Sequence, residues 1–175
     1  MSPRVPSSAA LPIASGALRI LMVLNWLSGA VIVAVLLFMP TRRWIMGALG
    51  LQPSPEADWA VMGLRAIALL GLFAIPLYYI ILKRLLAIVR TVRIGDPFVA
   101  ANADRLHAIA WALLVLQLLS LLIGAIARMV STPGHPIDIH AGFSISGWLA
   151  VLLTFLLARV FAAGTVMREE LEGTV

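Results

Sequence analysis

Apolar residues fill four long stretches of the chain, and polar residues gather between them. The stretches run from Gly16 to Met39, from Trp59 to Leu82, from Leu106 to Ala127 and from Gly142 to Ala163. About 20 helical residues are needed to cross the roughly 30 Å hydrocarbon core of a bilayer, so each stretch is long enough. None alternates polar and apolar residues at period two, as strands of a membrane barrel do. The pattern therefore predicts four transmembrane α-helices.

Helix-breaking residues mark the ends of these spans. Prolines occur after the first span and in the segments 52–56 and 131–136, which we expect to be outer loops. After Leu82 basic and apolar residues interleave at helical spacing, so the second helix should continue into a polar segment. Gly95 is expected to end that helix, with Asp96 as the N-cap and Pro97 as the first residue of the next one.

Composition excludes several classes of protein. Apolar residues make up 62% of the chain and charged residues 12%, with a mean hydropathy of +1.03, which is incompatible with an ordinary soluble domain. The absence of cysteine excludes disulfide frameworks, thiolate metal sites and cysteine nucleophiles. We interpret the net charge of +5 as a feature of membrane topology, so no direct binding of nucleic acid is expected.

The basic residues near the span ends predict the orientation, because translocation of Lys and Arg is disfavoured. With the N-terminus in the cytosol, the inner side carries Arg4, Arg19, Lys83, Arg84, Arg90, Arg93, Arg105, Arg159 and Arg168. The outer side then carries Arg42, Arg43 and Arg128. We therefore predict an all-α, antiparallel four-helix bundle in the bilayer with both termini in the cytosol.

Three segments follow from this arrangement. Residues 1–13, rich in Pro, Ser and Ala, are predicted to be a disordered tail. Residues 14–165 form the transmembrane domain, whose first span is longer than the 7–15 apolar residues of a signal-peptide core and is expected to be retained. Residues 166–175 are predicted to be a cytosolic C-terminal tail.

Small residues recur at every fourth position of the last span. They are Gly142, Ser146, Ala150, Thr154 and Ala158. Because lipid chains are as apolar as leucine, helices in a membrane associate through small residues that allow close approach. The stripe therefore predicts a packing face, either within one chain or in a homo-oligomer.

Asn25, Arg65 and Gln117 are polar residues inside predicted spans. For Asn25 and Gln117 we expect hydrogen bonds between helices, and for Arg65 a side chain that reaches the outer interface, toward Glu56 or Asp58. A second hypothesis from the same residues is an oligomer that conducts an ion or small solute past Arg65, Gln117 and a bend at Pro76.

No set of residues with a catalytic pattern is present. The chain lacks the G-x-S-x-G and H-E-x-x-H motifs and a glycine-rich phosphate loop, so we expect neither enzymatic activity nor a cofactor. His135, Asp138 and His140 have the spacing H-x-x-D-x-H in one outer loop and are candidates for a metal site.

Two motifs resemble those of a known family. They are Ile94-Gly95-Asp96-Pro97-Phe98, followed by Asn102 and Leu106, and the ending from Gly164 through Arg168-Glu169-Glu170 to Gly173-Thr174-Val175. With four spans, the chain after about Leu18 resembles the bacterial membrane family catalogued as domain of unknown function 2975. Its members are often encoded beside small helix-turn-helix regulators, which implies a cytosolic regulatory partner. The resemblance to a bacterial membrane family also implies the inner membrane as location. The family carries no established enzyme activity.

The same motifs suggest a binding surface on physical grounds. A rigid proline presents Phe98 at the inner surface between basic residues, which suits either an acidic protein surface or anionic headgroups. The candidate partner-binding residues are Arg90, Arg93, Gly95, Asp96, Pro97, Phe98 and Arg168.

Overall fold

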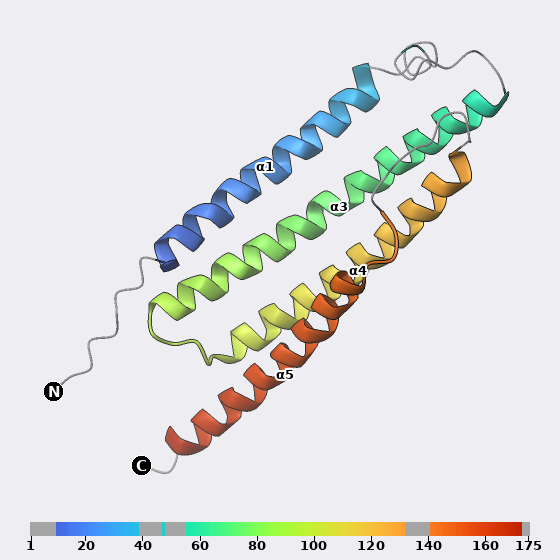
Figure 1. The fold of residues 1–175 in the computed structure, drawn as a ribbon. Coiled ribbons are helices and arrows are strands. Elements are labelled where there is room, and N and C mark those ends of the chain that lie inside the picture. The colour runs from blue at the N-terminus through green and yellow to red at the C-terminus, as the bar shows by residue number, and fades with distance from the viewer. Residues whose placement is uncertain (1–9, 39–46, 48–54, 132–140, 173–175) are drawn as a thin grey trace.

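The structure, a computed structural model, describes residues 10–38, 47, 55–131 and 141–172. Four helices account for nearly all of them (Figure 1): α1 (Ala10–Phe38), α3 (Pro55–Arg93), α4 (Ala100–Val130) and α5 (Ile145–Glu172). Each helix is long and apolar enough to cross a membrane. The prediction of an all-α chain with four candidate spans is confirmed.

The helices extend beyond the predicted spans. α1 begins at Ala10, so residues 10–13 are helical, and Pro12 is tolerated because it lies in the first turn, where backbone N–H groups have no helical partner. α3 has 39 residues, about 58 Å at 1.5 Å per residue, and continues past Leu82 as predicted. α5 continues to Glu172, so residues 166–172 of the predicted C-terminal tail extend the last helix.

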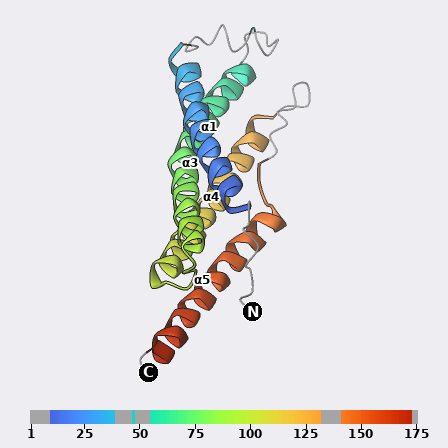
Figure 2. The ribbon, with the colours of Figure 1, turned by 90° about the vertical axis from the view of Figure 1, so that its left-hand side faces the viewer.

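Each helix packs against its neighbour in the sequence. α1 contacts α3, α3 contacts α4, and α4 contacts α5; among the described helices, no other pair is in contact. The bundle is therefore an open row without a common centre, as the two views in Figures 1 and 2 show. A buried apolar cluster lies between α3 and α4 around Ile81, Ile109 and Ala112.

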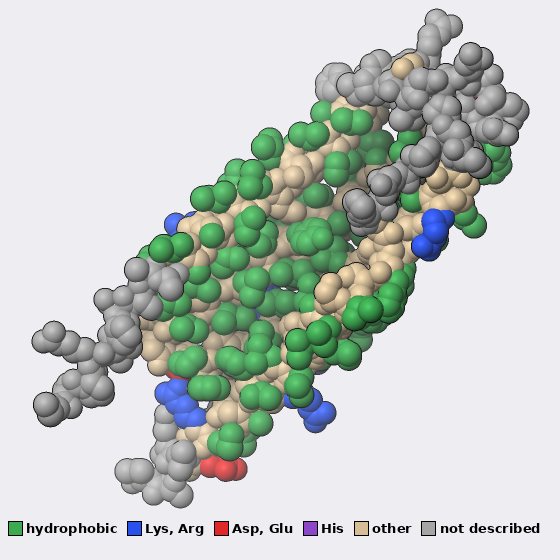
Figure 3. All heavy atoms as spheres, viewed as in Figure 1, with side chains coloured by type: hydrophobic (Ala, Val, Ile, Leu, Met, Phe, Trp, Pro, Cys, Tyr) green, Lys and Arg blue, Asp and Glu red, His purple; other side chains and the backbone are tan. Residues whose placement is uncertain are grey.

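Apolar side chains cover most of the surface drawn in Figure 3. Many large ones are more than half exposed, among them Trp26, Phe73 and Leu152. A water-soluble protein rarely exposes apolar surface on this scale, whereas lipid solvates such surface. The exposure therefore agrees with the hydropathy pattern.

Glycines allow the first three helices to approach closely. A Cβ at Gly29 of α1 would lie 3.3 Å from the Ile75 side chain of α3. A Cβ at Gly63 of α3 would lie 2.3 Å from Cγ1 of Val130 in α4. These contacts follow the small-residue packing expected in lipid, at positions other than the predicted stripe.

The last helix begins beside the middle of α4. The preceding residues, 141–144, are non-helical and run along α4 (Figures 1 and 2). Gln117 Nε2 donates a hydrogen bond to the Ser144 carbonyl oxygen at 3.3 Å, and Ser120 Oγ accepts one from the Gly142 N–H at 3.2 Å. Two polar side chains of α4 thus satisfy backbone groups that lipid could not satisfy.

The predicted stripe on the last span is only partly the face that packs against α4. Gly142 precedes α5, Ser146 and Ala150 are exposed, Thr154 is half-buried and Ala158 is buried. Among the α5 side chains that the structure describes, the buried ones are Val151, Ala158 and Thr165. They recur every seven residues, the spacing of helices that pack at a small crossing angle, whereas a four-residue stripe drifts around the helix. Contact of the exposed stripe residues with a second copy stays a prediction.

Gly95 ends α3, as predicted. Its φ is +86°, its N–H donates to the Val92 carbonyl oxygen at 3.1 Å, and the Asp96 N–H donates to the Thr91 carbonyl oxygen at 3.1 Å. These two bonds form a Schellman motif with glycine at the left-handed position. The chain therefore leaves α3 in a fixed direction.

The prediction for the start of the next helix is wrong. α4 begins at Ala100 with Val99 as its N-cap, and Val99 makes no side-chain capping bond. Asp96 does not cap the helix because its carboxylate pairs with Arg168 of α5. Residues 96–99 instead form a non-helical segment that places Phe98 against α5.

Replacement of Gly95 by alanine should lower the free energy of unfolding by about 1 kcal/mol, because a Cβ disfavours the left-handed conformation. Gly16→Ala is the control, since Gly16 lies in α1 with nothing within 4 Å of its built Cβ, and alanine favours a helix. SDS titration of the micelle-solubilised protein, followed by circular dichroism, measures both. Equal stability of Gly95→Ala and the wild type would contradict this explanation of the turn.

Candidate functional site

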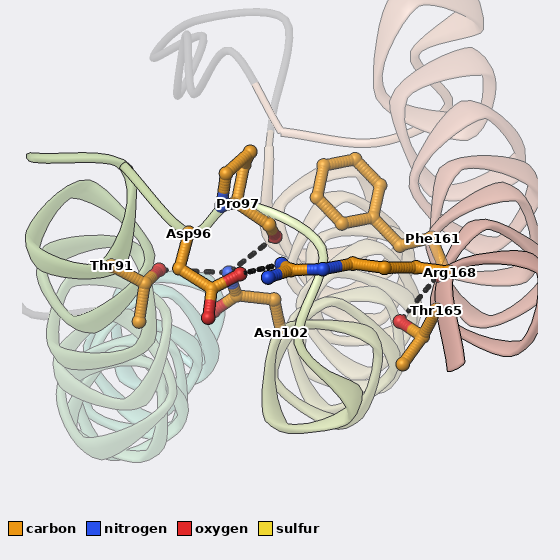
Figure 4. Close-up of polar contacts among 7 residues, drawn as sticks. All are labelled: Thr91, Asp96, Pro97, Asn102, Phe161, Thr165 and Arg168. Atoms are coloured by element: carbon orange, nitrogen blue, oxygen red, sulfur yellow. Dashed lines mark hydrogen bonds and ion pairs between the residues drawn. The ribbon is translucent and has the colours of Figure 1, made fainter. Parts of the chain in front are cut away.

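The candidate site joins the connector, residues 94–99 between α3 and α4, to the last turns of α5. Arg168 of α5 donates through Nη1 to Asp96 Oδ1 of the connector (Figure 4). The two side chains are 44% and 43% exposed, so solvent screening limits this ion pair to about 1 kcal/mol or less. Its contribution is mainly to orientation: it aligns the end of α5 with the connector.

An aromatic contact lies beside this ion pair. The Phe98 and Phe161 rings have centroids 5.3 Å apart. A Cβ at Gly164 would lie 3.0 Å from Phe98 Cδ1, so the ring lies directly on the α5 backbone. Phe98 nevertheless remains 42% exposed. One part of the ring therefore anchors the connector to α5, while the rest is accessible.

Hydrogen bonds from the side chain of Asn102 fix the connector to the ends of α3 and α4. Its side chain is fully buried, and Nδ2 donates to Thr91 Oγ1 at 2.7 Å and to the Pro97 carbonyl oxygen at 2.8 Å (Figure 4). Its Oδ1 accepts a hydrogen bond from Arg105 Nη1 at 2.7 Å. One amide thus links the end of α3, the connector and the first turns of α4, which gives the connector a defined shape.

The structure brings together five of the seven predicted partner-binding residues. Gly95, Asp96, Pro97, Phe98 and Arg168 form or adjoin the contacts described above. Arg90 and Arg93, which complete the predicted set, are exposed in the last turn of α3.

Asn102 was not among the predicted site residues. The sequence does contain a signal for its role. Asn102 follows Pro97 by five positions, near the start of a helix, where a side-chain amide can bond to nearby backbone carbonyls. The sequence pattern does not show which carbonyl it reaches.

Two of the three polar residues predicted within the spans, Asn25 and Gln117, bond to backbone carbonyls. Asn25 of α1 donates to the Ile75 carbonyl oxygen of α3 at 3.0 Å, so the expected bond between helices is present. Gln117 bonds to the 141–144 segment rather than to a helix. Arg65 is exposed on α3, as is Asp58, two turns earlier on the same helix.

Three residues between α4 and α5 were predicted as candidate metal ligands. His135, Asp138 and His140 lie outside the described residues. Within the described ranges, no three His, Cys, Asp or Glu side chains come close enough to hold a metal ion. The metal site stays a prediction.

The row of four candidate spans is typical of a multi-pass membrane protein. The chain belongs to the family described as protein of unknown function (DUF2975), whose model matches residues 43–175. The match begins later than the resemblance predicted from about Leu18, and it leaves α1 outside. No curated protein and no solved structure matches the chain.

Proposed function

We propose that this protein is a non-enzymatic, multi-pass protein of the bacterial inner membrane that binds a cytosolic regulator of the helix-turn-helix type. In this proposal the four helices cross the bilayer in alternating directions, and both termini and the connector lie in the cytosol. The observation that carries the proposal is the junction of the connector with the end of α5, which builds one shaped surface from segments far apart in the sequence.

Charge supports the orientation. The start of α1, the connector and the end of α5 lie at one end of the molecule (Figure 1). Basic residues of the described chain that belong to this end are Arg19, Lys83, Arg84, Arg90, Arg93, Arg105, Arg159 and Arg168. The positive-inside rule assigns such an end to the cytosol.

The composition of the surface supports protein binding. Phe98 is partly exposed, with basic Arg90 and Arg93 and acidic Glu170 exposed on neighbouring turns of α3 and α5. Aromatic anchors surrounded by charged groups are typical of specific interfaces, where a few residues carry most of the binding energy. The family resemblance supplies the class of partner. The transport hypothesis stays a prediction that no specific contact favours.

Co-purification tests the proposal. The tagged full chain is isolated from its membranes in mild detergent, and retained proteins are quantified by mass spectrometry. We expect a helix-turn-helix protein, with roughly 30-fold weaker retention by Phe98→Ala, because truncation of an aromatic anchor costs about 2 kcal/mol. Phe143→Ala is the matched control, since Phe143 is 71% exposed and adjoins α5 at its other end.

A second pair of variants tests the charged part of the surface. Arg168→Ala should weaken retention, whereas Arg128→Ala, at an exposed arginine in the last turn of α4, should not. Unchanged retention by both Phe98→Ala and Arg168→Ala would contradict the proposed surface. So would an equal loss in the two controls.

A further inference from the structure

A basic pocket lies between α3 and α4, separate from the contacts between the connector and α5. Its volume is about 480 Å³, and it is lined by Tyr79, Ile80, Lys83, Arg84, Ala87 and Arg105. Three of these six residues are cationic, and the described lining contains no carboxylate. No carboxylate of the described lining therefore offsets the positive charge of the three cations. Such a surplus of positive charge attracts anions.

Two of the three cations are held in position. The Lys83 ammonium lies 5.9 Å from the centroid of the Tyr79 ring, within the range of a cation–π interaction. Arg105 donates through Nη1 to Asn102 Oδ1, which uses one of the five N–H donors of its guanidinium. Asn102 is itself fully buried and fixed by two further bonds. The pocket thus holds charge in a preorganised geometry.

The position of the pocket along the membrane normal indicates which kind of anion it binds. The apolar stretch of α3 ends at Leu82 and that of α4 begins at Leu106, so the three cations lie where hydrocarbon gives way to headgroups. Tyr79 and Ile80 lie within the apolar stretch and supply uncharged wall. A phospholipid presents a phosphate and hydrocarbon in this order along the membrane normal, whereas a soluble phosphate has no apolar part.

We propose that this pocket binds the phosphate headgroup of an anionic phospholipid. Arg and Lys form charge-assisted hydrogen bonds with phosphate oxygens, and each basic residue near the membrane surface raises affinity for anionic lipid about fivefold. The proposal requires neither the regulator nor a particular orientation in the membrane.

Native mass spectrometry of the full chain tests the proposal. The protein is equilibrated in detergent with equal amounts of phosphatidylglycerol and phosphatidylcholine of identical acyl chains. The wild type should retain phosphatidylglycerol at least about tenfold better. Lys83→Gln/Arg84→Gln should lose most of this preference. Arg19→Gln/Arg159→Gln, which removes the same charge from exposed positions at the same end of the molecule outside the pocket, should keep it.

A charge-preserving variant guards against loss of fold. Lys83→Arg/Arg84→Lys should retain the preference, and circular dichroism should show equal helicity in all variants. Equal retention of the two lipids by the wild type would overturn the proposal, as would equal loss of preference in the two glutamine variants. Displacement of bound phosphatidylglycerol by millimolar inorganic phosphate would show a site for soluble anions and would also overturn it.

Discussion

Replacement of Gly124 by alanine should detach the 141–144 segment from α4 and destabilise the protein by about 3 kcal/mol. A Cβ at Gly124 would lie 2.4 Å from the Ala141 carbonyl oxygen and 2.8 Å from Gly142 Cα. Both atoms are backbone, so no side chain can rotate away to make room. Gly142 has a φ of +140°, a conformation that side-chain-bearing residues rarely adopt, so the path of this segment beside Gly124 depends on a glycine at position 142.

The measurement is SDS-induced unfolding of the micelle-solubilised protein, followed by circular dichroism. Gly71→Ala is the matched control, because Gly71 is also a glycine inside a helix of the membrane region and its built Cβ has Ile32 Cδ1 as its nearest neighbour, at 3.9 Å. The control should be neutral or slightly stabilising, since alanine favours a helix over glycine. Similar unfolding curves for the two variants would show that the segment does not contact α4 as described.

Replacement of Asn102 by leucine should destabilise the protein by about 3 kcal/mol, because each buried polar group that loses its partner costs about 1–3 kcal/mol. The Pro97 carbonyl oxygen loses the hydrogen bond from Nδ2, and Arg105 loses its acceptor. Leucine has the same number and branching of side-chain heavy atoms as asparagine, so no cavity forms and the effect reports the lost hydrogen bonds. The same SDS titration measures it.

Asn25→Leu is the comparison for Asn102→Leu. Asn25 is half-buried and makes a hydrogen bond to the Ile75 carbonyl oxygen between two helices, a type of bond that contributes about 1 kcal/mol in membranes. The expected ratio of the two effects is therefore about three. Equal destabilisation by both substitutions would contradict the role of Asn102 as the residue that shapes the connector.

The sequence predicted the number of helices because long apolar runs have a single physical solution in lipid. Without water, every backbone group in such a run must bond within its own helix. Gly95 was equally predictable, since glycine at a helix end has a specific conformational reason. These features depend on local chemistry, which a sequence pattern contains.

Features that depend on distant partners could not be predicted. Asp96 has the local preference of an N-cap, yet its carboxylate bonds to Arg168, 72 positions away. The start of α5 depends on Gln117 and Ser120, whose side chains stabilise a non-helical segment that hydropathy cannot distinguish from a helix. Helices that are apolar on all sides also carry little information about which face meets which neighbour.

The candidate site was predicted in part for the same reason. The connector motif and Arg168 are recognisable as short polar patterns beside apolar runs. The buried bonds of Asn102 and the convergence of Lys83, Arg84 and Arg105 on one pocket required the packing of α3 against α4. A site formed by side chains of two helices cannot be recognised from the sequence of either helix alone.

The open row of helices has a consequence for biosynthesis. Every helix contact in the described chain joins neighbours in the sequence, so each can form as soon as the second helix of the pair has left the ribosome. No early helix has to remain unpaired until a distant one is made. The order of synthesis is then also the order of assembly, which shortens the time during which polar side chains such as Asn25 face lipid without a partner.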